Sequence, residues 1–330
     1  MCGILSAAEA CSSLTTVTPP SAVDIGRRVS IRIVAADGSS RDLVGMLTDL
    51  ITVCGRDGSD IQFDPAAVSH WRLIPERAAR AGTGAPLSVR VRELETAMAD
   101  TCPAEVTMRH GEWLLRASTG ITQWANSAVP LGKPLGTVDD AIAHVIEFSR
   151  AQGIIPAVRV PLPTGENLDQ LLNSLGWAAN VDTYVLVHDT GAVMPPDADL
   201  LIRHEDEPSD NWRSVRGPDE PVSRMRRYPA VYASVWVGGQ AVGAGRIAIA
   251  DDWGVISQVF VGDEHRRYGV GTAVVQALAG IVRNSGVDRL AVSVSADNAK
   301  ALALYGSLGF RKHHMYRRRV LTERSVKGAS

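Results

Sequence analysis

The sequence predicts an α/β (α+β) protein in three units: a small all-β barrel, a middle unit, and a C-terminal unit whose sheet mixes parallel and antiparallel strands. Three observations predict this architecture. Short apolar segments separated by turn residues occupy the first part of the chain. A strand, a glycine-containing loop and a helix follow one another in the last part. The middle part repeats the last part, without a gap, at a spacing of 133 residues.

Residues 1–22 are expected to form a disordered leader that ends near the Pro19-Pro20 pair. They lack the basic start and the clean apolar core of a signal peptide. The four cysteines, at positions 2, 11, 54 and 102, do not have the spacing of metal ligands. We therefore expect free thiols in a reducing cytoplasm, and no bound metal.

Residues 23–80 contain about five short strands and resemble an SH3-like barrel. The expected strands cover residues 29–34, 41–50, 51–54, 61–63 and 70–74. Asp-Gly pairs at 37–38 and 57–58 are expected to turn the chain between strands. Residues 78–86, rich in Ala, Gly and Arg, are expected to form a linker to the middle unit.

The loop Arg266-Arg267-Tyr268-Gly269-Val270-Gly271 lies between an apolar segment at 255–261 and an amphipathic helix. One face of that helix carries Val270, Val274, Ala277, Leu278 and Ile281. Glycine allows successive backbone N–H groups to point at one place. The helix N-terminus adds unpaired N–H donors and the positive end of its dipole. This pattern is suited to binding a pyrophosphate.

A second motif, at residues 298–310, follows an expected strand at 290–295. Together the two motifs resemble the GNAT acyltransferase superfamily over residues 198–322, so residues 198–325 are expected to form a catalytic GNAT domain. The matching loop positions are Arg266, Gly269 and Gly271, and the matching helix positions are Asn298, Ala301, Leu304, Tyr305, Leu308, Gly309 and Phe310.

The resemblance implies an N-acetyltransferase that uses acetyl-CoA and needs no metal. Backbone N–H groups of residues 267–272 would bind the pyrophosphate, and residues 259–261 would pair with the pantetheine amides. Tyr305 would protonate the leaving thiolate, and Asn298 would contact the cofactor. The residues expected to bind the cofactor are Val259, Phe260, Val261, Arg266, Arg267, Tyr268, Gly269, Val270, Gly271, Thr272, Asn298, Ala301 and Tyr305.

The sequence does not identify a general base. Val255 occupies the position where some GNAT members carry a glutamate. Asp251, Asp252, Gln258 and Ser293 lie nearby, and a water relay or an amine that arrives neutral remains open. Trp212, Gln258 and Ser293 are the candidate substrate contacts. The alternative for Trp212, and for Tyr305 as well, is an aromatic side chain packed in the core.

Residues 88–190 are expected to form a degenerate GNAT-like unit. At the spacing of 133 residues, Gly136 falls on Gly269 and the Leu-Gly-Trp of 175–177 falls on the Leu-Gly-Phe of 308–310. Chemically important positions are lost: Val138, Gly165 and Leu172 replace Gly271, Asn298 and Tyr305, and Pro134 lacks an N–H donor. This unit is therefore expected to form one wall of the substrate cleft.

The remaining features limit the function. A net charge of −2 and the lack of a basic stretch with interleaved aromatics exclude general attraction to nucleic acid or an anionic membrane. Residues 317–319, three arginines, are expected on a charged sheet edge. The resemblance implies that the acceptor is an amine, with a small molecule favoured over a protein, and the oligomeric state is open. The alternative function is a catalytically weak protein that senses acyl-CoA and engages a partner through the barrel.

Overall fold

The computed structural model describes residues 19–35, 39–55, 59–73, 84–119, 125–197, 199–216 and 227–322. The chain divides into two compact units, Met1–Ala78 and Ala79–Ser330. Most of the expected leader, both Asp-Gly turns and most of the expected linker lie outside the described residues.

The first unit contains an antiparallel sheet with the strand order β4-β3-β2-β1-β5. Its strands are β1 (Arg28–Val34), β2 (Ser40–Asp49), β3 (Thr52–Cys54), β4 (Asp60–Gln62) and β5 (Val68–Leu73). Every second residue of β1 is buried, and these side chains pack with Leu47 and Val53 in one core. The five predicted strands are confirmed within the described residues.

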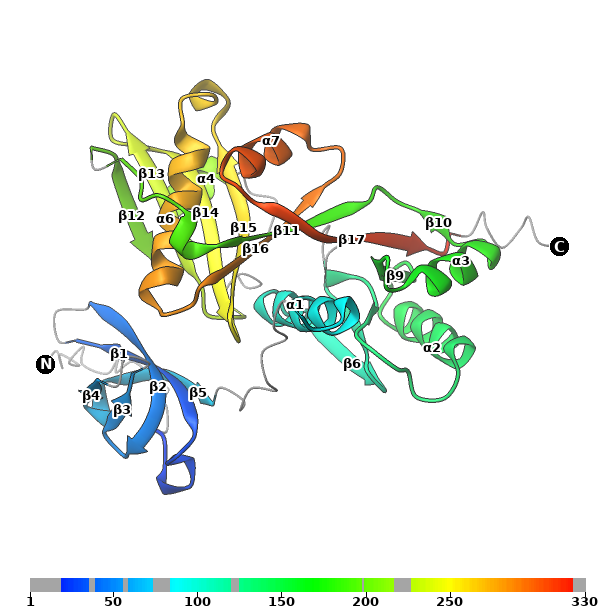
Figure 1. The fold of residues 1–330 in the computed structure, drawn as a ribbon, viewed down its shortest axis with the longest axis horizontal. Coiled ribbons are helices and arrows are strands. Elements are labelled where there is room, and N and C mark those ends of the chain that lie inside the picture. Colours follow the sequence, from blue (N-terminus) through cyan, green and yellow to red (C-terminus); the bar gives the residue numbers. More distant parts are fainter. Residues whose placement is uncertain are drawn as a thin grey trace, which may run out of the picture. The chain divides into compact units, whose positions relative to one another are not determined.

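The second unit is built around one mixed sheet, in the order β10-β17-β11-β16-β15-β14-β13-β12, with β9 also paired to β17 (Figure 1). The strands of this sheet are β9 (Ala157–Leu162), β10 (Ala178–Ala179), β11 (Thr183–Asp189), β12 (Leu201–Glu205), β13 (Val231–Val237), β14 (Gln240–Ala250), β15 (Trp253–Val261), β16 (Arg289–Ser295) and β17 (Arg311–Val320). A smaller antiparallel sheet contains β6 (Val106–His110), β7 (Trp113–Ala117) and β8 (Val129–Pro130). The helices are α1 (Leu87–Thr101), α2 (Val138–Ala151), α3 (Glu166–Ser174), α4 (Asp210–Arg216), α6 (Val270–Asn284) and α7 (Ala299–Ser307).

Helix α6 covers one face of the large sheet, across β13, β14 and β15 (Figure 1). Glycine permits this close approach, because a Cβ atom on Gly243 or Gly245 would lie 2.5 Å from a methyl group of α6. Successive strand residues point to opposite faces. Ala244 and Ala248 accordingly pack with Trp212 of α4 on the other face, and α1 also contacts β14 and β15.

The two expected GNAT-like units share this sheet. Strand β11, from the middle part of the chain, lies between β16 and β17. Strand β17 continues past β11 and pairs with β9 and β10 (Figure 1). Each half of the second unit therefore completes its sheet with a strand from the other half.

The positions of the elements follow the sequence repeat. A shift of 133 residues carries α3 onto α7, α2 onto all of α6 but its first residue, and β9 onto the last six residues of β16. The same shift carries Thr183 onto Tyr316, and these two residues are partners in the β11–β17 register.

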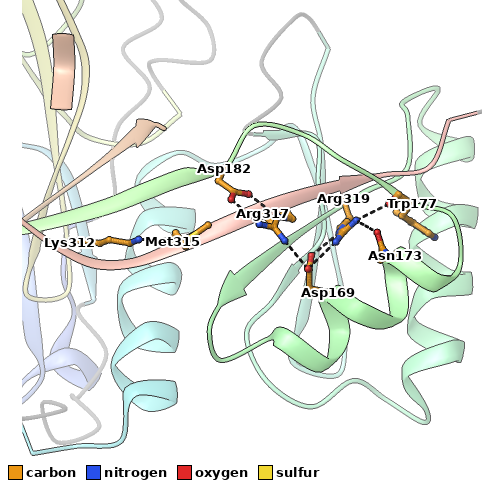
Figure 2. Close-up of polar contacts among 8 residues, drawn as sticks. All are labelled: Asp169, Asn173, Trp177, Asp182, Lys312, Met315, Arg317 and Arg319. Carbon is orange, nitrogen blue, oxygen red and sulfur yellow. Dashed lines mark hydrogen bonds and ion pairs between the residues drawn. The ribbon is translucent and has the colours of Figure 1, made fainter. Parts of the chain in front are cut away.

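The arginines at 317–319 are not on a sheet edge, so that prediction is wrong. Strand β17 is internal because β9 pairs along its C-terminal half. Figure 2 shows that Arg317 and Arg319 both reach Asp169 of α3, with closest N···O distances of 3.0 and 2.7 Å. Arg317 also pairs with Asp182, at 2.8 Å. The two arginines thus attach α3 to the shared sheet.

Candidate active site

Strands β15 and β16 separate at the point where the site forms. Their parallel pairing runs from Trp253–Arg289 to Ile256–Val292 and stops there. Just beyond that point the β14–β15 register shifts, and Gln258 has a φ of +56°, in the left-handed region. A bulge of this kind turns backbone groups away from the ladder. The strands therefore open into a gap that exposes backbone N–H and C=O groups.

A cavity of about 340 Å³ occupies this gap. Strands β15 and β16 line it through residues 255–260 and 292–295, and helix α7 lines it through Ala301 and Tyr305, with Asn298 at the start of that helix. Met98 and Thr101 of α1, Cys102, and Arg246 of β14 also line the cavity. The wall expected from residues 88–190 is thus provided by α1.

Tyr305 is nearly buried, with 4% of its surface exposed, and its ring packs edge-on against Phe310. Burial raises the pKa of its phenol above the usual value of 10.0, so the hydroxyl remains protonated at neutral pH. Within the described residues this hydroxyl has no hydrogen-bond partner, although it belongs to a residue that lines the cavity. The Tyr305 hydroxyl is therefore available to donate a hydrogen bond or a proton to a ligand in the cavity.

The N-terminus of α6 has the free donors that the loop motif predicts. Gly269 precedes the helix with a φ of +78°, and neither a side-chain cap nor an acidic first-turn residue is present. The backbone N–H groups of residues 267–272 have no acceptor among the described residues. A Cβ atom on Gly271 would lie 3.3 Å from Leu304 of α7 and 3.5 Å from Val261. The loop therefore adjoins the cavity without lining it.

The other predicted loop residues are mostly exposed. Arg266 donates to the carbonyl of Val261 at 3.2 Å and pairs with Asp263 at 2.5 Å. Arg267 has a φ of +68°, and 80% of the Tyr268 surface is exposed. The side chains of these three residues do not line the cavity, and their parts in cofactor binding stay predictions.

Asn298 has a structural role as well as a place on the cavity. It is the N-cap of α7, and its side-chain oxygen accepts from the backbone N–H of Ala301 at 3.1 Å. The side-chain NH₂ group points to no acceptor in the part of the chain that is described.

Trp212 does not line the cavity, so its prediction as a substrate contact is wrong. Its side chain is 0% exposed, and its indole N–H donates to the Gly245 carbonyl at 3.0 Å. It also packs edge-on against Tyr232. Trp212 is buried because its large aromatic ring fills the space between α4 and the sheet.

Of the four residues named as lying near the missing general base, Gln258 and Ser293 line the cavity and the two aspartates do not. Asp252 is buried and lies 3.5 Å from Arg289, and neither it nor Asp251 lines the cavity. Gln258 does line it, and its side-chain oxygen accepts from Arg216. The described lining contains no carboxylate and no imidazole.

Sequence reasoning missed the wall formed by Met98, Thr101, Cys102 and Arg246. Thr101 and Arg246 are 145 residues apart in the chain, yet the Arg246 guanidinium donates to the Thr101 carbonyl at 3.0 Å. No local motif links such distant positions. The only signal at 246 is a single Arg in a strand that is otherwise almost entirely apolar.

The described residues contain no group of three or more His, Cys, Asp or Glu side chains arranged to hold a metal ion. They also contain no helix that is both long and apolar enough to cross a membrane.

Residues 88–319 match a family model described as "Probable histone acetyltransferase Rv0428c C-terminal". The Mycobacterium tuberculosis protein named "Probable histone acetyltransferase Rv0428c" is 29% identical over 305 residues, which are 88% of this chain and 93% of that protein. The "Uncharacterized N-acetyltransferase YobR" of Bacillus subtilis is 25% identical over 244 residues, 69% of this chain and 98% of that protein.

Two solved structures share the fold. A GCN5-related N-acetyltransferase from Kribbella flavida has a TM-score of 0.57 at 15% identity, covering 71% of this chain and 95% of its own. A tandem GNAT protein from the clavulanic acid biosynthesis pathway has a TM-score of 0.51 at 16% identity, covering 71% and 87%. At these identities the likeness is one of fold alone.

Proposed function

Because this chain belongs to the family described as probable histone acetyltransferase Rv0428c C-terminal and is an N-acetyltransferase, we propose that it transfers the acetyl group of acetyl-CoA to a small-molecule amine. The transfer is direct, within a ternary complex of enzyme, acetyl-CoA and amine. The observation that carries the proposal is a protonated, unpartnered phenol on a cavity that opens between two separated strands.

Acetyl-CoA would lie across the separated strands. The free N–H groups of residues 267–272 suit its pyrophosphate, since a helix N-terminus stabilises anions. Residues 259–261 follow the bulge and would pair with the pantetheine amides. The thioester would then lie at the bulge, where a backbone N–H can stabilise the oxyanion that develops on the carbonyl.

The reaction forms a C–N bond and breaks a C–S bond. A neutral amine attacks the thioester carbonyl, and the tetrahedral intermediate expels the CoA thiolate. Tyr305 is suited to give its hydroxyl proton to that sulfur, a contribution of about 100- to 10,000-fold. Since the described lining has no carboxylate or imidazole, water takes up the proton lost by the amine, and a proton returned through water restores the Tyr305 hydroxyl.

We further propose that residues 88–190 are a GNAT-like copy that no longer binds acetyl-CoA. The equivalent helix, α2, is closed by a capping box: Thr137 accepts from Asp140 N–H, and the Asp140 carboxylate accepts from Thr137. The N–H donors that a pyrophosphate needs are therefore partly used, and the added carboxylate repels it.

The size of the cavity favours a small acceptor. About 340 Å³ must hold the acetyl end of the cofactor as well as the amine. A protein lysine is the second candidate, since a relative with 29% identity is named a probable histone acetyltransferase. A lysine side chain is narrow enough to enter such a cavity from outside.

The test is release of free CoA thiol from acetyl-CoA, measured with a panel of small primary amines and with histone-tail peptides. Turnover of small amines that exceeds turnover of the peptides supports the proposal. Turnover of the peptides alone would mean that the acceptor is a protein and not a small molecule. Binding of acetyl-CoA without turnover of either class supports the alternative of a protein that senses acyl-CoA.

A further inference from the structure

Arg246 is the only charged residue among the described residues that line the cavity. It lies on β14, beside the bulge, because its register partner is Ser257. Only 6% of its surface is exposed. The site that would receive the acceptor therefore contains one buried positive charge and, in its described lining, no negative one.

The protein uses only part of the hydrogen-bonding capacity of this guanidinium. One terminal nitrogen donates to the Thr101 carbonyl at 3.0 Å, and the other lies 3.4 Å from the Ser257 hydroxyl. The Nε atom is buried without a partner. A guanidinium has five N–H donors, and no Asp or Glu among the described residues forms an ion pair with this one.

A buried charge without a counter-ion is costly. The Thr101 carbonyl is at the C-terminal end of α1, where the helix dipole is negative, and it offsets part of the cost. A carboxylate would offset more, since it matches the guanidinium in charge and in bidentate geometry. The missing counter-ion is therefore expected to arrive with a ligand.

We propose that Arg246 binds a carboxylate of the acetyl acceptor, so that the acceptor is a small amino acid-like molecule carrying both an amine and a carboxylate. This inference rests on the proposed function, because it identifies the substrate class of the same site. Arg246 and Thr101 lie on the wall formed by α1 and β14, whereas Tyr305 comes from α7. The acceptor would thus be held by its carboxylate on one wall while its amine meets the thioester.

The test compares matched acceptors: a set of amino acids and the same amino acids with the carboxylate converted to a neutral amide. The value of kcat/KM is measured for each pair with the full-length protein and with Arg246→Gln. The wild type is expected to prefer the acid. Loss of a hydrogen-bonded charge pair is expected to reduce the acid-to-amide ratio in the variant by about 10- to 100-fold.

A purely structural role of Arg246 as the cap of α1 would lower turnover of both members of a pair and leave the ratio unchanged, which would overturn the inference. Arg203→Gln is the matched control, because Arg203 does not line the cavity and its Cζ atom lies 3.9 Å from the centroid of the Trp236 ring. This variant is expected to keep the acid-to-amide ratio of the wild type.

If Arg246→Gln does not fold, the acid-to-amide ratio of the wild type tests the inference by itself. A diamine in place of the amino acid, with a second positive charge, is expected to be a poor acceptor.

Failure of the inference is distinguishable from failure of the proposed function. Equal acetylation of acids and amides by the wild type would refute the role of Arg246 and leave the small-amine acetyltransferase intact. Acetyl-CoA binding without turnover of either member of any pair, while histone peptides are acetylated, would refute both.

Discussion

At the residue scale, Tyr305 is the proposed general acid. Its phenol is protonated at neutral pH, burial raises its pKa further, and it lines the cavity without a protein partner in the described part of the chain. We expect Tyr305→Phe to lower kcat by about 100- to 10,000-fold with little change in the Kd for acetyl-CoA. Steady-state kinetics and calorimetric titration measure the two quantities. Unchanged kcat with a true acceptor would remove the general-acid role.

His313 gives the protein a predictable dependence of stability on pH. Burial, with a contribution from the neighbouring His314, lowers the pKa of His313 from 6.5 to about 4. Between these values the unfolded chain binds a proton that the folded chain does not, so stability falls as pH drops from about 6.5 to about 4. Urea midpoints across this range should be less pH-dependent in His313→Gln. The same dependence in both proteins would contradict this assignment.

The residues found in the site show what local patterns can predict. Tyr305, Ala301 and Asn298 were predicted because one helix motif contains them all, and Gln258 and Ser293 because they lie on the strands that flank the loop. Arg246 was missed because its partners come from distant parts of the chain. A lone Trp carries no signal for the direction of its side chain, which explains the error at Trp212.

At the scale of elements, two related helices differ in their N-termini. Helix α6 begins after Gly269 without a side-chain cap, whereas Thr137 and Asp140 close α2. The loss of the second glycine was visible in the sequence, and the capping box gives a further physical reason for the difference. Of these two helices, α6 is the one whose first N–H groups have no side-chain cap.

Gly271→Glu tests the role of α6 in binding. Position 271 is in the first turn of α6, where the new side chain would contact Leu304 of α7. The added carboxylate would repel a pyrophosphate at this helix end. We expect calorimetric titration to detect no acetyl-CoA binding. Gly280→Glu is the matched control because it adds the same charge to the same helix, where a Cβ atom has open space. Equal affinities in the two variants would mean that the pyrophosphate binds elsewhere.

Strand positions were predicted well, and strand partners were not. Alternation of apolar residues marks where a strand lies, so the five strands of the first unit were placed close to their observed bounds. It does not state which strands are neighbours. The arginines of β17 therefore looked like a sheet edge, although β9 covers that side.

At the scale of the whole molecule, the exchange of β11 and β17 links the two halves of the second unit. Asp169 of α3 holds Arg317 and Arg319 of β17, and Arg319 is nearly buried. We expect Asp169→Asn to lower the free energy of unfolding by about 3–5 kcal/mol, since it leaves a buried arginine without its counter-ion.

The shared sheet predicts how that loss is observed. Binding of acetyl-CoA should raise the temperature of one thermal unfolding transition. Asp169→Asn should lower the temperature of that same transition, although Asp169 does not line the cavity. Asp210→Asn, which breaks an exposed pair with Arg213, should leave the transition nearly unchanged. Two independent transitions, only one of them sensitive to acetyl-CoA, would show that the halves unfold separately.

We infer that the protein has one acetyl-CoA site, at the N-terminus of α6. Calorimetric titration of the full-length protein with acetyl-CoA tests this inference. We expect one site per chain in the wild type and in Gly280→Glu, and none in Gly271→Glu. Two sites per chain would mean that α2 still binds the cofactor, and no binding to the folded wild type would contradict the claim altogether.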